Sequence, residues 1–128
     1  MAEWKKLAKA LILAEGHIDT KEVRILRQAF LDYDRIDTEE LVFLKELRNQ
    51  AKSYVKSFTE LYIDSVKNYM LAEGAYLNPE KAKWLRQAIF ADGQVDEEEK
   101  RLLRELKAEA KKTSPEFEVL YQTTIENG

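Results

Sequence analysis

Acidic side chains at a fixed spacing are the residues of this sequence best suited to chemistry. The segments AEGHIDTKE (14–22) and ADGQVDEEE (91–99) each place an acidic residue directly before a glycine. An aspartate follows that glycine by three residues and a glutamate by six. Carboxylate oxygens are the ligands that Ca²⁺ and Mg²⁺ prefer. The candidate metal ligands are therefore Glu15, Asp19, Glu22, Asp92, Asp96 and Glu99.

An ordinary EF-hand loop is excluded at both places. Such a loop takes oxygen ligands from its first and third positions and has glycine at the sixth. With Gly93 at the sixth position, Ala88 and Phe90 occupy the first and third, and Gly16 places leucines there. A weaker site, shared between two turns that the fold brings together, stays open.

The same carboxylates also predict helix starts. An Asp, Asn or Ser before a helix accepts a hydrogen bond from the third helical amide, and a Glu at that third position returns the bond in a capping box. Asn78 and Ser114, each followed by proline, are also candidate caps. Pairs with the spacing of a capping box are Asp19–Glu22, Asp37–Glu40, Ser57–Glu60 and Asp96–Glu99. Capping and weak metal binding do not exclude each other.

These signals, together with apolar residues at helical spacing, predict an all-α fold. No stretch alternates with period two for long. The chain has only four glycines and two prolines, which also favours helix. We expect a compact seven-helix bundle with helices at about 2–14, 20–32, 38–53, 58–72, 79–91, 97–112 and 115–126.

An internal repeat divides the chain into two halves. LRQA occurs at 26–29 and again at 85–88, and many other residues recur at the same offset of 59. LAEG recurs at an offset of 58, so one residue is gained in the turn that follows. Each half, about 7–64 and 65–124, is too small to bury a core of its own. We therefore predict that residues 1–128 form one domain in which the halves pack about a pseudo-two-fold axis.

Composition excludes several classes of function. The net charge of −3 gives no electrostatic reason to bind nucleic acid. The chain has no cysteine, one histidine (His17) and no glycine-rich phosphate loop, so thiolate, Ser-His-Asp and nucleotide chemistry lack their residues. The apolar run Leu11–Ala14 is too short to insert into a membrane. We expect a cytoplasmic protein that is not an enzyme.

The motif A-[DE]-G-x-[IV]-D-x-x-E, present in AEGHIDTKE and ADGQVDEEE, resembles the tellurite-resistance TerB and TerB-like family. The resemblance implies a seven-helix bundle with internal duplication over nearly the whole chain. It also implies an accessory or scaffold role in stress response or phage defence, with protein partners that include membrane-associated ones. Acidic motif residues that bind metal are implied at Glu15, Asp19, Glu22, Asp92, Asp96 and Glu99. The two middle copies of the motif depart from it, because Asp34 replaces one glycine and Lys81 replaces one glutamate.

Two functions follow as hypotheses. The first is a non-catalytic TerB-like scaffold that binds protein partners, as a monomer or as a homodimer. The second is a weak divalent-cation sensor that binds Ca²⁺ or Mg²⁺ through the acidic turns.

Overall fold

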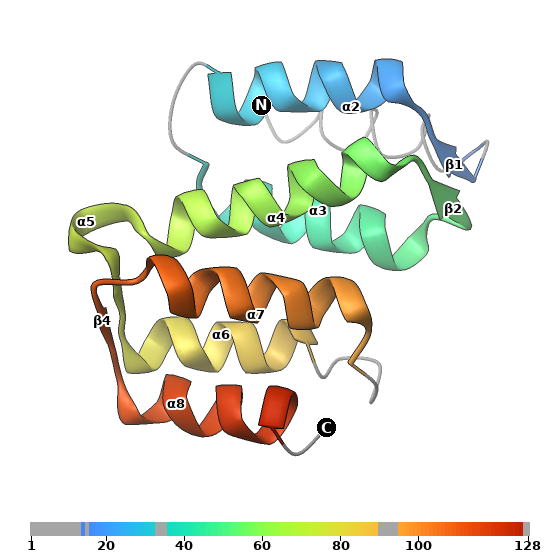
Figure 1. Cartoon of the computed structure of the whole chain (residues 1–128). Helices are drawn as coiled ribbons and strands as arrows, with labels where there is room; N and C mark the ends of the chain where they lie inside the picture. Colours follow the sequence, from blue (N-terminus) through green and yellow to red (C-terminus); the bar gives the residue numbers. More distant parts are fainter. Residues whose placement is uncertain (1–13, 15, 33–35, 90–94, 127–128) are drawn as a thin grey trace. The chain divides into compact units, whose positions relative to one another are not determined.

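The computed structural model describes residue 14 and residues 16–32, 36–89 and 95–126. The chain divides into two compact units, Met1–Tyr69 and Met70–Gly128. Helices dominate both units, and each described strand has only two residues (Figure 1). The prediction of an all-α fold is therefore confirmed. The first predicted helix, at about 2–14, lies outside the described residues except for its last position.

The first unit begins, within the described residues, with the strand β1. Its order is β1 (His17–Ile18), α2 (Thr20–Arg27), the π-helix η1 (Gln28–Asp32), α3 (Thr38–Gln50), β2 (Ser53–Tyr54) and α4 (Lys56–Met70). Phe30 of η1 meets Phe43 of α3 edge to face, with ring centroids 5.7 Å apart. Such aromatic pairs add to the free energy that burial of apolar surface contributes. Ile18, Leu41, Leu44, Leu47, Phe58 and Leu61 are fully buried.

The second unit repeats this pattern after a short helix. Its order is α5 (Ala72–Ala75), β3 (Tyr76–Leu77), α6 (Pro79–Ile89), α7 (Glu97–Glu109), β4 (Lys112–Thr113), α8 (Pro115–Tyr121) and the π-helix η2 (Gln122–Glu126). Helix α8 lies against α6, as Figure 1 also shows. Leu77, Leu85, Leu103, Leu106 and Phe117 are fully buried.

Two short parallel strand pairs were not predicted from the sequence. β1 pairs with β2, with His17 opposite Ser53, and β3 pairs with β4, with Tyr76 opposite Lys112. Both registers are related by the 59-residue offset of the sequence repeat. The helices predicted at 38–53 and 97–112 were therefore too long, because the structure ends them at Gln50 and Glu109.

The backbone after each of these helices explains the early ends. Ala51 and Ala110 adopt extended conformations, with ψ of 141° and 139°. The next amide then bonds to an earlier turn: Lys52 N donates to Gly16 O over 2.8 Å, and Lys111 N donates to Ala75 O over 2.9 Å. Helix propensity alone does not predict these early helix ends, because residues 51–53 and 110–112 contain no helix breaker.

The turn before each strand pair needs a left-handed residue. Gly16 has φ of +77°, which glycine adopts without strain. In the second unit the gained residue places Ala75, with φ of +55°, at the structurally equivalent position, directly after Gly74 at +93°. Ala75 is thus a non-glycine residue in a conformation that costs an L-residue free energy.

The predicted capping box of Ser57 and Glu60 is wrong. Helix α4 begins at Lys56, and the Phe58 amide donates to Val55 O over 3.0 Å. Ser57 Oγ is buried and has no hydrogen-bond partner among the described residues. The residue before the helix is therefore Val55, and Ser57 lies within the first helical turn.

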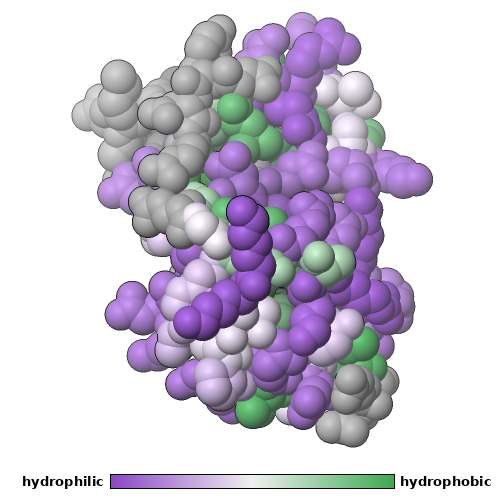
Figure 2. Space-filling view, turned by 60° about the vertical axis from the view of Figure 1, so that its left-hand side comes forward, coloured by the Kyte–Doolittle hydropathy of each residue, from purple (hydrophilic) through white to green (hydrophobic). Residues whose placement is uncertain are grey.

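Hydrophilic side chains cover most of the face shown in Figure 2, with apolar residues in small areas. Among the described residues, Ile25 of α2 and Val119 of α8 are the large apolar side chains that are most exposed, at 57% and 62%. No helix in the described part of the chain is long and apolar enough to cross a membrane.

Candidate functional site

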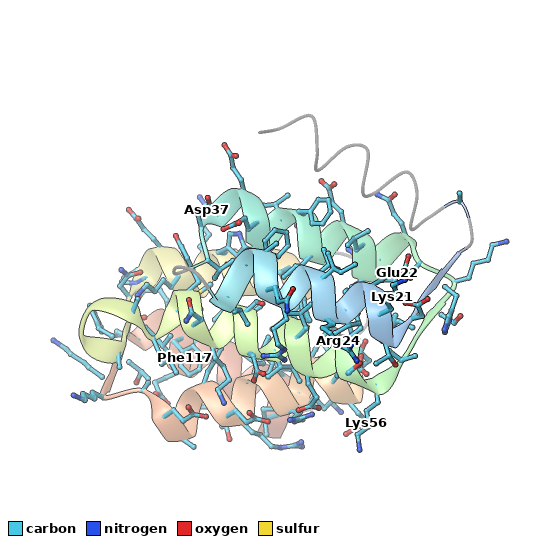
Figure 3. All side chains as sticks on the ribbon, turned by 90° about the horizontal axis from the view of Figure 1, so that it is seen from above. Lys21, Glu22, Arg24, Asp37, Lys56 and Phe117 are labelled. Atoms are coloured by element: carbon cyan, nitrogen blue, oxygen red, sulfur yellow. The ribbon has the colours of Figure 1, made fainter. Side chains whose placement is uncertain are left out.

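Asp19 and Glu22 hold the start of α2 through two reciprocal hydrogen bonds. The Glu22 amide donates to Asp19 Oδ1 over 2.8 Å, and the Asp19 amide donates to Glu22 Oε1 over 2.9 Å. Extended backbone at Asp19 directs its carboxylate to the third helical amide. Both negative charges also lie at the positive end of the helix dipole. This predicted capping box is confirmed, and Figure 3 shows Glu22 in the first turn of α2.

Two further turns repeat this arrangement. On α3, the Glu40 amide donates to Asp37 Oδ1 over 2.8 Å and the Asp37 amide donates to Glu40 Oε1 over 3.0 Å. On α7, Asp96 and Glu99 form the same pair of bonds at 2.8 and 3.0 Å. Glu99 differs from the others because it is only 5% exposed. Both boxes were predicted correctly.

The remaining turn uses different side chains. Asn78 Oδ1 accepts the Lys81 amide over 2.8 Å and so caps α6 as predicted. Lys81 stands where the other three copies have glutamate, and its ammonium cannot accept the return bond. The Lys81 Nζ donates instead to Met70 O over 2.9 Å and to Tyr76 O over 3.2 Å.

The six candidate metal ligands fall into three groups. Asp19 and Glu22 lie together on the first unit, and Asp96 and Glu99 lie together on the second, each pair in its capping box. Glu15 and Asp92 lie outside the described residues. Among the residues that the structure places, no three His, Cys, Asp or Glu side chains are grouped around one possible metal position. A site shared between the two turns remains a prediction.

Arg27 does not use the acidic turns for its described contact. Its guanidinium bonds to Asp64 Oδ2 of α4 over 3.0 Å, and both side chains are partly exposed. The Asp64 partner has no acidic counterpart 59 residues later, where the sequence has Thr123. The contact of Arg27 is therefore specific to the first unit.

His17 is exposed, and it has a partner that the sequence did not reveal. Its Nδ1 lies 2.7 Å from Ser53 Oγ across the β1–β2 pair. The backbone amides of Lys52 and Ser53 both donate to Gly16 O, so they are not free to stabilise an oxyanion there. The His17–Ser53 contact therefore lacks the free backbone amides that form the oxyanion hole of a serine hydrolase.

A polar cluster on the second unit was also missed. Lys107 Nζ lies 2.6 Å from both carboxylate oxygens of Glu118, and Thr113 Oγ1 donates to Glu118 Oε2. The hydrogen bond from Lys107, followed by that from Thr113, holds the pKa of Glu118 below its usual value, while partial burial opposes the shift. Lys107 Nζ also lies 5.6 Å from the Tyr121 ring centroid. The cluster joins α7, β4 and α8.

The first unit contains a related contact at the repeat offset. Arg48 lies over the Tyr62 ring at 5.4 Å, and these positions precede Lys107 and Tyr121 by 59 residues. The acidic member of the cluster is not repeated, because Thr59 stands at the place of Glu118. The signal in the sequence for this contact is a cation and an aromatic residue that recur together at equivalent positions of the two repeats.

No protein-family model, curated protein or solved structure matches the chain.

Proposed function

We propose that the chain is a non-catalytic helical scaffold of the TerB-like kind, which acts by binding protein partners in the cytoplasm. The family resemblance of the motif suggests stress response or phage defence as its setting. A cytoplasmic location suits a chain without cysteine.

The hydrogen bonds that the acidic motif residues form are the observation that supports this proposal. In the three copies that have both Asp and Glu, each residue bonds to the backbone amide of the other at the start of a helix. In the fourth copy an ammonium binds two carbonyls. The motif therefore serves helix placement in every described copy, a role that needs no metal and that fits a scaffold.

Repeated local contacts support an origin by duplication. The strand registers, the amide bonds from Lys52 and Lys111, and the two cation–aromatic contacts all recur at the 59-residue offset. We propose that the halves at about 7–64 and 65–124 are copies, with seven main helices and a pseudo-two-fold relation. One domain of 128 residues is part of the same proposal.

A metal titration separates the scaffold from the cation sensor. Calorimetry and thermal unfolding with Ca²⁺, Mg²⁺ and Zn²⁺ at millimolar concentration are expected to give no saturable heat and no rise in Tm. The matched variants are Asp19→Asn and Asp96→Asn, because asparagine caps a helix as well as aspartate does but lacks the charge. Saturable heat that these variants abolish, at unchanged stability, would establish the sensor instead.

Partner binding is tested by cross-linking and mass spectrometry of the tagged chain at native expression. Single exposed apolar side chains are normal on protein surfaces, so Ile25 and Val119 serve as probes of two faces. We expect a partner that binds the purified chain, and whose binding Ile25→Glu or Val119→Glu weakens at least about tenfold. Asp96→Asn is the control. If no partner is found in unstressed, tellurite-treated and phage-infected cells, the scaffold proposal is wrong.

A further inference from the structure

The segment Leu71–Ala75, which includes the short helix α5, connects the end of α4 to β3 within the second unit. It contains two successive residues with positive φ, Gly74 at +93° and Ala75 at +55°. A Cβ at Gly74 would meet nothing within 4 Å. The space beside Gly74 in this connector is therefore open.

Lys81 bonds to both ends of this connector. Its Nζ donates to Met70 O, directly before the connector, and to Tyr76 O, directly after it, over 2.9 and 3.2 Å. A lysine ammonium has three donors and bonds well to carbonyls at the negative end of a helix. Met70 is the last residue of α4, so its carbonyl lies at that end.

The identity of residue 81 is what distinguishes this turn from its copies. Glutamate stands at the equivalent position of α2, α3 and α7 and completes a capping box there. A glutamate at 81 would cap α6 but would place an acceptor, not a donor, beside the two carbonyls. Lysine gives up the return bond to the Asn78 amide and gains two bonds to the connector.

We propose that Lys81 is a clamp that keeps the connector between α4 and β3 in a single conformation. The far end of the connector is held separately, because Tyr76 pairs with Lys112 in the β3–β4 register and its ring lies 5.0 Å from Lys112 Nζ. Loss of the clamp is therefore expected to free Leu71–Ala75 and the last turn of α4, and to leave β3 in place.

Amide hydrogen exchange of the full chain tests the clamp. Lys81→Met keeps most of the alkyl stem and removes the donors, and Lys81→Gln also allows the capping box that glutamine forms with Asn78. In both variants we expect amides of residues 70–75 to exchange about tenfold faster, because two charge-assisted bonds are lost. The Ser114 amide, which donates to Leu77 O, is expected to stay within about twofold.

Lys83→Met is the matched control, since Lys83 is exposed on the same helix. It is expected to leave the connector unchanged. Unchanged exchange at 70–75 in both Lys81 variants would overturn the proposal. Equal acceleration in the connector and throughout α3 and α7 would also overturn it, because Lys81 would then act on overall stability. The Lys81→Gln variant keeps this comparison possible if Lys81→Met folds poorly.

Discussion

Two buried serines are expected to respond in opposite ways to the same substitution. Ser65 of α4 is 0% exposed and Ser114 is 1% exposed. Ser114 caps α8 by accepting the Phe117 amide over 3.3 Å, whereas Ser65 Oγ has no hydrogen-bond partner among the described residues. The burial of the two side chains is matched, so the hydrogen bond is the main difference between them.

The expected magnitudes follow from that difference. An unsatisfied buried hydroxyl costs about 1–3 kcal/mol, and alanine is also the better helix former by a few tenths of a kcal/mol. The cavity left by one oxygen offsets only about 0.3 kcal/mol. Ser65→Ala should therefore raise the free energy of unfolding by about 1 kcal/mol. Ser114→Ala loses a helix cap and should lower it by about 1 kcal/mol.

Urea unfolding followed by circular dichroism measures both changes, with calorimetry to show whether the two units unfold together. A difference of about 2 kcal/mol between the variants corresponds to several degrees in Tm for a chain of this size. Thr124, 59 residues after Ser65, is 3% exposed and also lacks a partner, so Thr124→Val should stabilise as well. If Ser65→Ala destabilises as much as Ser114→Ala, the account of the buried hydroxyl is refuted.

Three further predictions concern the backbone and the charge cluster. Because the Glu118 pKa is lowered on folding, its contribution is present at neutral pH and is lost as the pH falls through that lowered pKa. Glu118→Gln should therefore cost up to about 1 kcal/mol at pH 7 and nothing at a pH where wild-type Glu118 is protonated, as urea midpoints against pH will show. Ala75→Gly should stabilise the chain by about 0.5–1 kcal/mol, and Gly16→Ala should destabilise it by about 1 kcal/mol or more, as measured by thermal melts. If both substitutions stabilise or both destabilise to the same extent, the two positions are not equivalent. Ser57→Ala should change the unfolding free energy by less than about 0.5 kcal/mol, whereas a loss near 1 kcal/mol would restore the capping role that we reject.

The helical fold and three capping boxes could be predicted because their causes are local. Asp19 and Glu22 need only three residues of separation and a following helix to form their bonds. The same local rule gave a wrong prediction at Ser57. Helix α4 begins at Lys56, and the Phe58 amide donates to the Val55 carbonyl. This start lies two residues before the predicted start at 58, and a shift of this size is beyond what local sequence determines.

The strand pairs and the side-chain contacts across them were not predictable in this way. His17 meets Ser53 across 36 residues, and Lys81 bonds to backbone carbonyls, which every residue carries. The Lys107–Glu118 pair is separated by 11 residues and a strand. Contacts of these kinds depend on the path of the chain, and the repeat is the part of the sequence that hints at them.

The two strand pairs also bear on how a repetitive chain avoids misfolding. β1 and β3 occupy equivalent positions of the repeat, as do β2 and β4, so a pairing of β1 with β4 is the exchange that the chain must disfavour. Exchange would set His17 opposite Lys112 and Tyr76 opposite Ser53. It would lose both the imidazole–hydroxyl bond and the ammonium–ring contact that the native registers provide. Each pair thus carries its own recognition contact, which favours correct assembly of each half over swapping between halves or between neighbouring chains.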